Sequence, residues 1–190
     1  MYRLHGIKFP FVAIARVAEY LYCLSLKEKT FSCGGMTLPY FYHFYNPTFR
    51  VERCVEIPIV LHYIKNNGGR ILEVGNVLPN YIDHKHDVVD KYEISPGVIN
   101  EDIVSYKSSE KYDLIVSVST IEHVGWDEAP KDDRKIIAAM ENMKKLLNPA
   151  GKIVFTVPIA YNTWLDKMLT NGSLGLTNVY YMRRMSRFGG

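Results

Sequence analysis

The sequence predicts an α/β fold in which a doubly wound, mostly parallel β-sheet carries helices on both faces. Residues 51–190 alternate short apolar segments with helical stretches, an alternation typical of parallel strands joined by helical crossovers. The segment Tyr112–Ser119 contains the unbroken run Leu-Ile-Val-Ser-Val, as expected for a central strand covered on both faces. With 190 residues and 47% hydrophobic content, the chain can bury the core of one ordinary domain.

Five strands and one long helix can be assigned in order. The strands are expected at Arg70–Val74, at His86–Asp90, in a weak segment ending at Asp102 and Ile103, at Tyr112–Ser119 and at Lys152–Val157. An amphipathic helix is expected over Asp132–Leu147, because apolar residues recur along one side of it. The turn Asn148–Gly151 should end this helix.

Only Val179–Met185 resembles a further strand after these five. We therefore expect an incomplete C-terminal edge of the sheet, either because the sequence is a fragment or because the domain is a shortened version. An exposed strand edge invites pairing with another chain, which predicts a homodimer.

The first part of the chain differs in character from the rest. We expect residues 1–50 to form an N-terminal helix and an aromatic cap segment, and residues 51–190 to form the α/β domain, the two making one compact unit. Within Phe9–Leu26, residues such as Ile14, Val17 and Leu21 recur at helical spacing, which predicts an amphipathic helix packed on the domain. A membrane-surface or partner helix is the alternative. The segment is shorter than the roughly 20 apolar residues that span a bilayer, so no membrane span is expected.

The composition argues against several classes of function. The formal net charge is only +3 and the basic residues are scattered, so no nucleic-acid partner is expected. Three cysteines without CxxC spacing argue against a disulfide framework or a structural zinc site, and favour a reducing, cytoplasmic location. His84, His86 and Asp87 could suggest a metal site. Because no further ligand cluster accompanies them, a solvated loop is preferred and no metal is expected.

The pattern around the first strand predicts a nucleoside-binding cleft. In the turn Glu73–Asn76, Gly75 lets the backbone turn tightly while a ligand approaches closely. The separation between this turn and Asp90 is close to the roughly 20 residues expected for an acid that binds ribose hydroxyls. Glu93 lies close behind Asp90. A carboxylate suits a sugar diol because it accepts two hydrogen bonds at once. An ordinary loop glycine and a solvated Glu93 remain the alternatives.

Four segments of the second part carry a family resemblance through their order and spacing. They are Ile71–Gly75 (ILEVG), Tyr112–Ser117 (YDLIVS), Thr120–Val124 (TIEHV) and Leu146–Lys152 (LLNPAGK). The first resembles the first motif of the class I S-adenosylmethionine-dependent methyltransferases, and the second resembles their fourth motif. The third is similar to the segment after strand four in many small-molecule methyltransferases, and the last is similar to the turn before strand five. The resemblance runs from about Val51 to the end of the chain.

This resemblance implies a Rossmann-like methyltransferase domain with S-adenosylmethionine as cofactor. Carried over residue by residue, the implied cofactor-binding residues are Glu73 and Gly75 beside the methionine part, Asp90 at the ribose, Asp102 and Ile103 beside the adenine, Ser119 and Thr120 near the sulfonium, and Asn76 and Glu93 as further contacts. The implied reaction moves a methyl group to a small or sugar-like acceptor, at a hydroxyl, by in-line displacement.

His123 falls where the family has its acceptor pocket. There it would act as the catalytic base that removes the proton of a hydroxyl acceptor. The alternative is a structural histidine that is hydrogen-bonded to Glu122 or to the backbone.

The first motif departs from the family pattern. Family members usually carry a second glycine where this chain has Val77, and the turn Asn76–Pro79 is bulkier and stiffer. The alternative function is therefore a non-catalytic methyltransferase-like domain that acts as a binding or scaffold partner. A nicotinamide-dependent dehydrogenase is disfavoured, because no full GxGxxG follows the first strand.

The stretch Tyr40–Tyr45 is unusually aromatic. It is expected either to cover a sheet edge or to form one wall of an acceptor pocket, where rings can stack on a sugar or shield a sulfonium. Together with Val51–Glu56, it resembles segments of methyltransferase-like proteins encoded among sugar and polysaccharide genes. This resemblance favours a carbohydrate-related acceptor.

Overall fold

The computed structural model describes residues 9–25 and 28–185, with side chains from residue 14 onward. The chain divides into two compact units. The first comprises residues up to Pro58 together with those from Tyr181, and the second comprises Ile59–Tyr180. The division thus falls inside helix α2 (Arg53–Lys65), rather than after residue 50 where the sequence changes character, and the end of the chain belongs to the first unit.

The first unit contains helix α1 (Phe9–Ser25), the strands β1 (Thr30–Cys33) and β2 (Met36–Pro39), and the 3-10 helix η1 (Thr48–Arg50). β1 and β2 form an antiparallel hairpin in which Cys33 pairs with Met36. The turn residues Gly34 and Gly35 have φ of 57° and 80°. A two-residue hairpin turn needs such positive φ angles, and glycine adopts them without strain.

The helix predicted within Phe9–Leu26 is confirmed. Within the first unit, Cys23 of α1 is fully buried, and Glu19 pairs with Arg50 at 2.5 Å. The packing of Ile14, Val17 and Leu21 on the α/β domain stays a prediction, because α1 and that domain belong to different units.

The aromatic stretch Tyr40–Tyr45 packs within the first unit. The ring of Tyr40 lies 5.2 Å from that of Phe31 in β1, and the ring of Phe44 lies 5.7 Å from that of Tyr20 in α1. The aromatic stretch thus contacts both the hairpin and the helix of this unit, although Phe44 itself is 50% exposed. Their expected role in an acceptor pocket stays a prediction.

The second unit is a five-stranded parallel sheet. Its strands are β3 (Ile71–Val74), β4 (Asp87–Val89), β5 (Val98–Ile99), β6 (Tyr112–Val118) and β7 (Leu147–Thr156). Their spatial order is β5-β4-β3-β6-β7, and every neighbouring pair is parallel. The order reverses between β3 and β6, as in doubly wound Rossmann-like sheets. The predicted fold class is confirmed.

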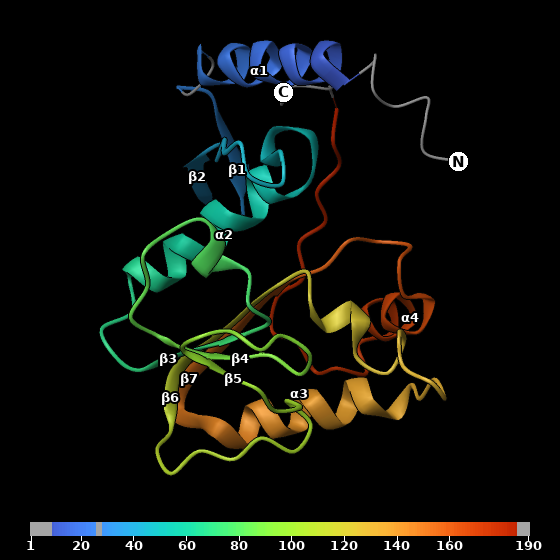
Figure 1. Cartoon of the computed structure of the whole chain (residues 1–190). Coiled ribbons are helices and arrows are strands. Elements are labelled where there is room, and N and C mark those ends of the chain that lie inside the picture. Colours follow the sequence, from blue (N-terminus) through green and yellow to red (C-terminus); the bar gives the residue numbers. More distant parts are fainter. Residues whose placement is uncertain (1–8, 26–27, 186–190) are drawn as a thin grey trace. The chain divides into compact units, whose positions relative to one another are not determined.

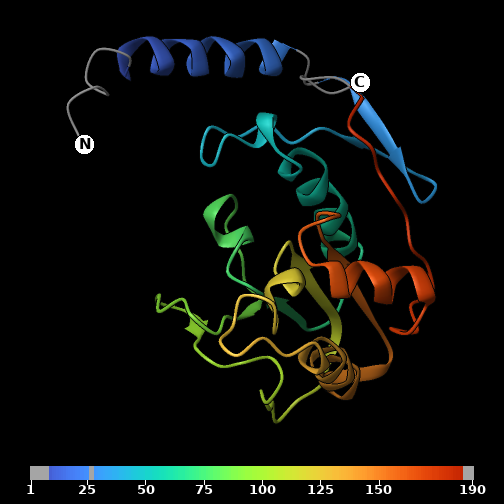
Figure 2. The same cartoon turned by 90° about the vertical axis from the view of Figure 1, so that its right-hand side faces the viewer.

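Helices flank both faces of this sheet. On one face, Leu72, Val74 and Ile115 share a core cluster with residues of α3 (Arg134–Leu146) and α4 (Thr163–Asn171). Figures 1 and 2 show α3 along that face and the second-unit part of α2 on the opposite side of the sheet. The run in β6 is buried from Leu114 to Val118, as its unbroken apolar character predicted.

Asp113 of β6 fixes the amino ends of the central strands. Its Oδ2 accepts a hydrogen bond from the backbone N of Arg70 at 2.7 Å, and its Oδ1 accepts one from Nδ2 of Asn148 at 2.8 Å. A Cβ on Gly69 would lie only 2.0 Å from Oδ2, so glycine is required beside this carboxylate. The starts of β3, β6 and β7 are thereby held together by one side chain.

Three predicted boundaries differ from the structure. β5 has two residues and ends at Ile99, before Asp102 and Ile103. β7 begins directly at Leu147, with residues 148–151 forming an irregularity in its register with β6. The strand expected at Val179–Met185 is wrong, because this described segment has no strand and its apolar side chains are exposed. Instead of strand pairing, the side chain of Arg184 donates to the carbonyl oxygens of Phe49 and Arg50 within the first unit.

Within residues 9–25 and 28–185, no helix combines the length and the hydropathy that crossing a lipid bilayer requires.

Candidate ligand-binding cleft

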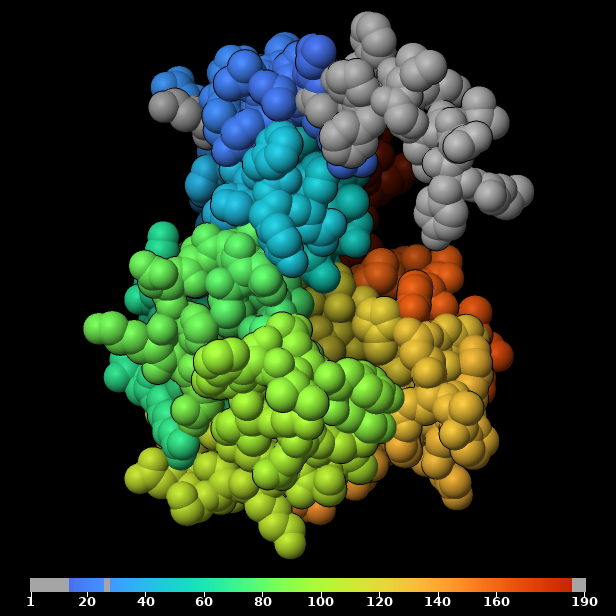
Figure 3. Space-filling model, viewed as in Figure 1, coloured from blue at the N-terminus to red at the C-terminus, as the bar shows by residue number. Residues whose placement is uncertain are grey.

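A cleft of about 480 Å³ opens in the second unit at the carboxyl ends of β3, β4, β5 and β6. The lining residues follow these strands and are Val74, Gly75, Val89, Asp90, Lys91, Tyr92, Glu93, Glu101, Asp102, Ile103, Thr120, His123, Val124 and Glu128. In Figure 3, the green segments and the yellow to orange segments that supply the two walls lie next to each other on the face shown. This is the point where the strand order reverses, and open α/β sheets bind ligands there.

Gly75 gives the cleft an exposed stretch of backbone. Its φ is +91°, and its N–H donates to the carbonyl oxygen of Val89 at 2.8 Å. A Cβ at this position would lie 2.1 Å from Oγ1 of Thr120, which lines the opposite wall. Both the backbone angle and the close approach therefore require glycine.

Asp90 lies directly after β4, on the cleft, and its carboxylate is held by the backbone. Oδ2 accepts a hydrogen bond from the N–H of Asn76 at 3.0 Å, and Oδ1 accepts one from each of Tyr92 and Glu93 at 2.9 Å. A carboxylate offers about four acceptor positions. Asp90 can thus accept from a ligand while three amides keep it in place.

Glu73 does not line the cleft, although the family resemblance implies a cofactor contact for it. Its side chain is fully buried, and its Oε1 accepts hydrogen bonds from the backbone N–H groups of Val77 at 3.0 Å and Leu78 at 2.8 Å. Its Oε2 lies 2.7 Å from Nε2 of His86. Glu73 therefore anchors the start of the 3-10 helix η2 (Leu78–Asn80) from inside the protein.

The loop after Gly75 leaves the cleft open. Val77, Leu78 and Pro79 are absent from its lining, and Leu78 is fully buried. Asn76 is also outside the lining, and its Nδ2 donates to Oε1 of Glu93 at 2.6 Å. The bulk of Val77 and Pro79 thus lies away from the cavity.

The remaining predicted contacts are divided between cleft and core. Asp102, Ile103 and Thr120 line the cleft, and Ile103 is buried. Ser119 does not line it, and its φ of +40° turns the chain between β6 and Thr120. Six of the nine expected cofactor contacts, namely Gly75, Asp90, Glu93, Asp102, Ile103 and Thr120, therefore lie around one cavity.

His123 ends the 3-10 helix η3 (Ile121–His123) and lines the cleft. Its Nδ1 lies 2.5 Å from Oδ2 of Asp127, and the hydroxyl of Tyr161 donates to the same oxygen at 2.7 Å. The rings of His123 and Tyr161 stand edge to face, 4.8 Å apart. Nε2 is 3.7 Å from Oε1 of Glu122, too far for a hydrogen bond.

This arrangement defines the proton positions on His123. A carboxylate only accepts, so Nδ1 carries the hydrogen that bonds Asp127, and in the neutral ring Nε2 keeps its lone pair. The hydrogen bonds with His123 and Tyr161 hold the pKa of Asp127 below its ordinary value. The same bond to Asp127 raises the pKa of Tyr161. The imidazole is thus oriented as a base whose partner stays ionised.

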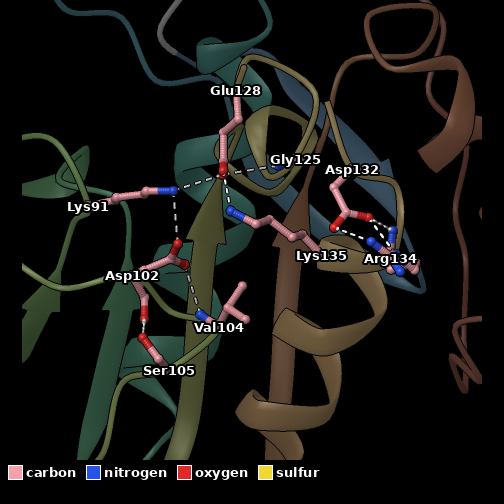
Figure 4. Close-up of polar contacts among 9 residues, drawn as sticks. All are labelled: Lys91, Asp102, Val104, Ser105, Gly125, Glu128, Asp132, Arg134 and Lys135. Carbon is pink, nitrogen blue, oxygen red and sulfur yellow. Dashed lines mark hydrogen bonds and ion pairs between the residues drawn. The ribbon is translucent and has the colours of Figure 1, made fainter. Parts of the chain in front are cut away.

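The cleft carries a salt-bridge network across its width (Figure 4). Nζ of Lys91 lies 2.9 Å from Oδ2 of Asp102 and 2.9 Å from Oε1 of Glu128. Glu128 also contacts Lys135 of α3 and accepts from the N–H of Gly125 at 3.3 Å. Burial alone would lower the pKa of Lys91, but its hydrogen bonds to Asp102 and Glu128 outweigh burial and raise it. The lysine therefore stays charged between the two walls.

The lining is acidic overall. Lys91 is the one lysine among the lining residues, which include five carboxylates, Asp90, Glu93, Glu101, Asp102 and Glu128. No group of three or more His, Cys, Asp or Glu side chains in the described part of the chain is arranged to hold a metal ion. His86 pairs with Glu73, and Asp87 pairs with Arg70.

Sequence reasoning missed the residues that complete the site. Lys91, Glu101 and Glu128 line the cleft, and Asp127 and Tyr161 orient His123. Asp127, four residues after His123, could have been noticed as an acid close to the candidate base. Tyr161 had no local signal. Tyr161 lies beside His123 because the next residue, Asn162, holds the two segments together. Asn162 is the N-cap of α4, and its Nδ2 donates to the carbonyl oxygen of Glu122 in η3 at 2.7 Å.

No family model matches this chain, and no curated protein matches it. Among solved structures, the chain is similar to the N-methyltransferase NodS from Bradyrhizobium japonicum in complex with S-adenosyl-L-homocysteine, at 20% identity and a TM-score of 0.42, over 55% of this chain and 60% of that one. A sugar N-methyltransferase from a Streptoalloteichus species matches at 16% identity and a TM-score of 0.42, over 68% and 58%. An S-adenosylmethionine-dependent methyltransferase from Clostridium acetobutylicum matches at 14% and 0.39, over 52% and 47%. The alignments span between 47% and 60% of the length of these proteins.

Proposed function

We propose that the chain binds S-adenosylmethionine in this cleft and transfers its methyl group to a hydroxyl of a small, sugar-like acceptor. The observation that carries the proposal is the convergence of Gly75, Asp90, Asp102 and His123 on one cavity of about 480 Å³. That volume lies within the range of about 300–1,000 Å³ for small-ligand sites. The function thus rests on backbone access, two acids and an oriented base around a single space.

The residues of the cleft fit the cofactor. Gly75 offers backbone without a side chain, and a Cβ there would fill the space next to Thr120. Asp90 retains capacity to accept a hydrogen bond from a ribose hydroxyl. The excess of carboxylates favours a sulfonium cation and disfavours the pyrophosphate of a dinucleotide. When bound, S-adenosylmethionine supplies an electrophilic methyl group.

His123 and Asp127 supply the proton chemistry in this proposal. Nε2 of His123 accepts the proton of the acceptor hydroxyl as its oxygen becomes the nucleophile. Asp127, 2.5 Å from Nδ1, keeps the ring oriented and stabilises the imidazolium that forms. Glu122, whose Oε1 is 3.7 Å from Nε2, adds a negative charge beside that cation. The remaining contribution is positioning, which suits an in-line displacement.

A sugar-like acceptor and a carbohydrate-related role are the finer part of the proposal. They are supported by the resemblance of Tyr40–Tyr45 and Val51–Glu56 to segments of methyltransferase-like proteins encoded among sugar and polysaccharide genes. Near the base, the ring of Tyr161 offers an apolar surface beside a hydrogen-bonding group. The free thiols of Cys23, Cys33 and Cys54 support a reducing, cytoplasmic location.

The alternative function, a non-catalytic scaffold domain, depends on the bulk of residues 76–79 abolishing cofactor binding. Because Val77, Leu78 and Pro79 do not line the cleft, we expect Val77→Gly to leave S-adenosylhomocysteine affinity unchanged. A large gain in affinity in that variant would favour the scaffold function instead.

The first experiment is calorimetric titration of S-adenosylmethionine and S-adenosylhomocysteine into the protein. We expect saturable heat in the wild type and weaker binding in Gly75→Ala. The absence of any heat in the wild type would overturn the proposed function.

The second experiment measures methyl transfer from radiolabelled cofactor to a panel of sugars, with the corresponding amino sugars as the competing acceptor class. His123→Gln should lower kcat about 10²- to 10⁴-fold at neutral pH while cofactor affinity is kept. His62→Gln, on α2 and outside the cleft, is the matched control and should behave as the wild type. Transfer to amines that does not need His123 would contradict the hydroxyl proposal.

A homodimer is a further proposal. β7 is the last strand in the sheet order and is ten residues long, so its outer edge is suited to pairing with a second copy. Light scattering should then give twice the mass of 21.9 kDa. A monomer mass would rule out this arrangement.

A further inference from the structure

Lys91 joins two walls of the cleft that the proposed function uses for different purposes. On one side, Asp102 belongs to the wall expected beside the adenine. On the other side, Glu128 follows the segment that carries His123 and Asp127. Two ion pairs of Lys91, each 2.9 Å long, link these walls (Figure 4).

These contacts are stronger than ordinary surface pairs. The side chains of Lys91, Asp102 and Glu128 are 32%, 23% and 13% exposed, so solvent screens the charges only in part. Asp102 is itself fixed, because its Oδ1 accepts from the N–H of Val104 at 3.0 Å. Lys91 is therefore held between two anchored carboxylates.

Glu128 is also tied to the structure behind the cleft. Its Oε2 contacts Nζ of Lys135 in α3, and its Oε1 accepts from the N–H of Gly125. Gly125 and Glu128 enclose Trp126 and Asp127 in the sequence. Glu128 is therefore coupled by a hydrogen bond to the short segment that contains the partner of His123.

We propose that Lys91 and Glu128 are positioning residues that transmit ligand binding at the adenine end of the cleft to the segment carrying Trp126 and Asp127. The inference rests on the proposed function. An amino group of a bound nucleobase competes with Lys91 for Asp102, because both are donors to one carboxylate. Lys91 then shifts its hydrogen bonding toward Glu128, and the segment follows. In this way, occupation of the cofactor site adjusts the orientation of His123 before the acceptor binds.

The chain contains its own reporter for this movement. Its two tryptophans are Trp126 and Trp164, whose rings lie 4.9 Å apart at 89°. Neither lines the cleft. A ligand-dependent change in tryptophan fluorescence therefore requires transmission through the protein.

The experiment titrates S-adenosylhomocysteine into the full chain and records calorimetric heat and tryptophan fluorescence in parallel. The variants are Lys91→Met and, as matched control, Lys135→Met, which removes the other lysine of Glu128 without touching the cleft lining. Lys91→Leu is a second variant, in case Lys91→Met does not fold by circular dichroism. We expect heat and a fluorescence change in the wild type and in Lys135→Met, and heat with loss of the fluorescence change in the Lys91 variants.

Each other outcome overturns the inference. A fluorescence change that persists in the Lys91 variants shows that the signal takes another route, and wild-type heat without a fluorescence change shows that there is no signal. Loss of heat in the Lys91 variants alone makes Lys91 a direct ligand contact. The absence of heat in the wild type refutes the proposed function as well, and is thereby distinguished from the other results.

Discussion

Gly75 and Thr120 approach each other across the cleft so closely that a Cβ on Gly75 would lie 2.1 Å from Oγ1 of Thr120 and 2.8 Å from its Cβ. Gly75 follows β3 and Thr120 follows β6, the two neighbouring strands between which the sheet order reverses. The contact fixes how near the two turns can come. The absence of a Cβ atom at Gly75 therefore has two effects: it permits the close packing against Thr120, and it leaves the backbone accessible to a ligand.

Gly75→Ala should therefore destabilise the protein more than a second glycine substitution at a similar backbone angle. Gly97 has φ of +83°, but a Cβ there would meet nothing within 4 Å. Gly97→Ala should cost about 1–2 kcal/mol for the left-handed conformation, and Gly75→Ala about 1–3 kcal/mol more for overpacking. Urea denaturation measures both values. Equal losses in the two variants would contradict the close contact with Thr120.

Glu73 should act on stability through its two backbone amides and His86. Glu73→Ala removes a buried acceptor from the N–H groups of Val77 and Leu78, and we expect a loss of about 3 kcal/mol or more. Glu73→Gln should lose less, since an amide oxygen can still accept from both. Exposed Glu101→Gln is the control and should stay within about 0.5 kcal/mol of the wild type. If denaturation curves show that Glu73→Ala loses no more stability than Glu101→Gln, the anchoring role is refuted.

Asn162 should stabilise α4 and η3 together. Its Oδ1 accepts from the N–H groups of Trp164 and Leu165, and its Nδ2 donates to Glu122. Asn162→Ala should cost about 1–2 kcal/mol through the lost cap. Asn162→Ser keeps a cap acceptor and loses the amide donor to Glu122, so it should fall between Ala and wild type. The order of the three unfolding midpoints, followed by tryptophan fluorescence, tests this assignment.

The His123–Asp127 contact predicts a pH dependence of stability. The pKa of Asp127 is lower in the folded state than in the unfolded state, chiefly because of its hydrogen bond with His123. The contribution of Asp127 to stability is therefore fully present above the unfolded pKa of about 4, and it is lost as pH falls through the lowered folded-state pKa. The stability difference between wild type and Asp127→Asn should thus shrink as pH is lowered below about 4. At neutral pH it should be no more than about 1 kcal/mol, because both side chains are 43% exposed.

Denaturant titrations at pH 7 and at low pH measure this difference, and Asp133→Asn serves as control for the removal of one nearby carboxylate. A difference between wild type and Asp127→Asn that grows as the solution becomes more acidic would contradict the lowered pKa.

The sheet could be predicted because its strands carry a local signal. The run Leu114–Val118 is apolar apart from Ser117 and is buried, and Gly75 and Asp90 follow their strands at a spacing set by the fold. β5, with two residues, has no such run, and Val179–Met185 has apolar residues without a neighbouring strand. Strand patterns report side-chain burial, and they do not report whether a pairing partner exists.

The cleft was less predictable than the sheet, because side-chain direction depends on long-range contacts. Glu73 was expected beside a ligand, but two amides of the following turn and His86 hold it inside. Tyr161 lies beside His123 because the next residue, Asn162, donates a hydrogen bond to Glu122, which is 40 residues earlier in the sequence. Neither relationship has a signature in the residues next to these positions.

The two ends of the sheet have different roles. Hydrogen bonds to the carboxylate of Asp113 hold β3, β6 and β7 together at their amino ends, whereas the cavity opens at the carboxyl ends of the strands. Side chains around the opening can therefore diversify toward new ligands while the frame is secured from the far end. For the same reason, a library of variants restricted to exposed residues of the mouth, such as Tyr92 and Glu101, should keep a common melting temperature, against which gains in recognition can be read directly.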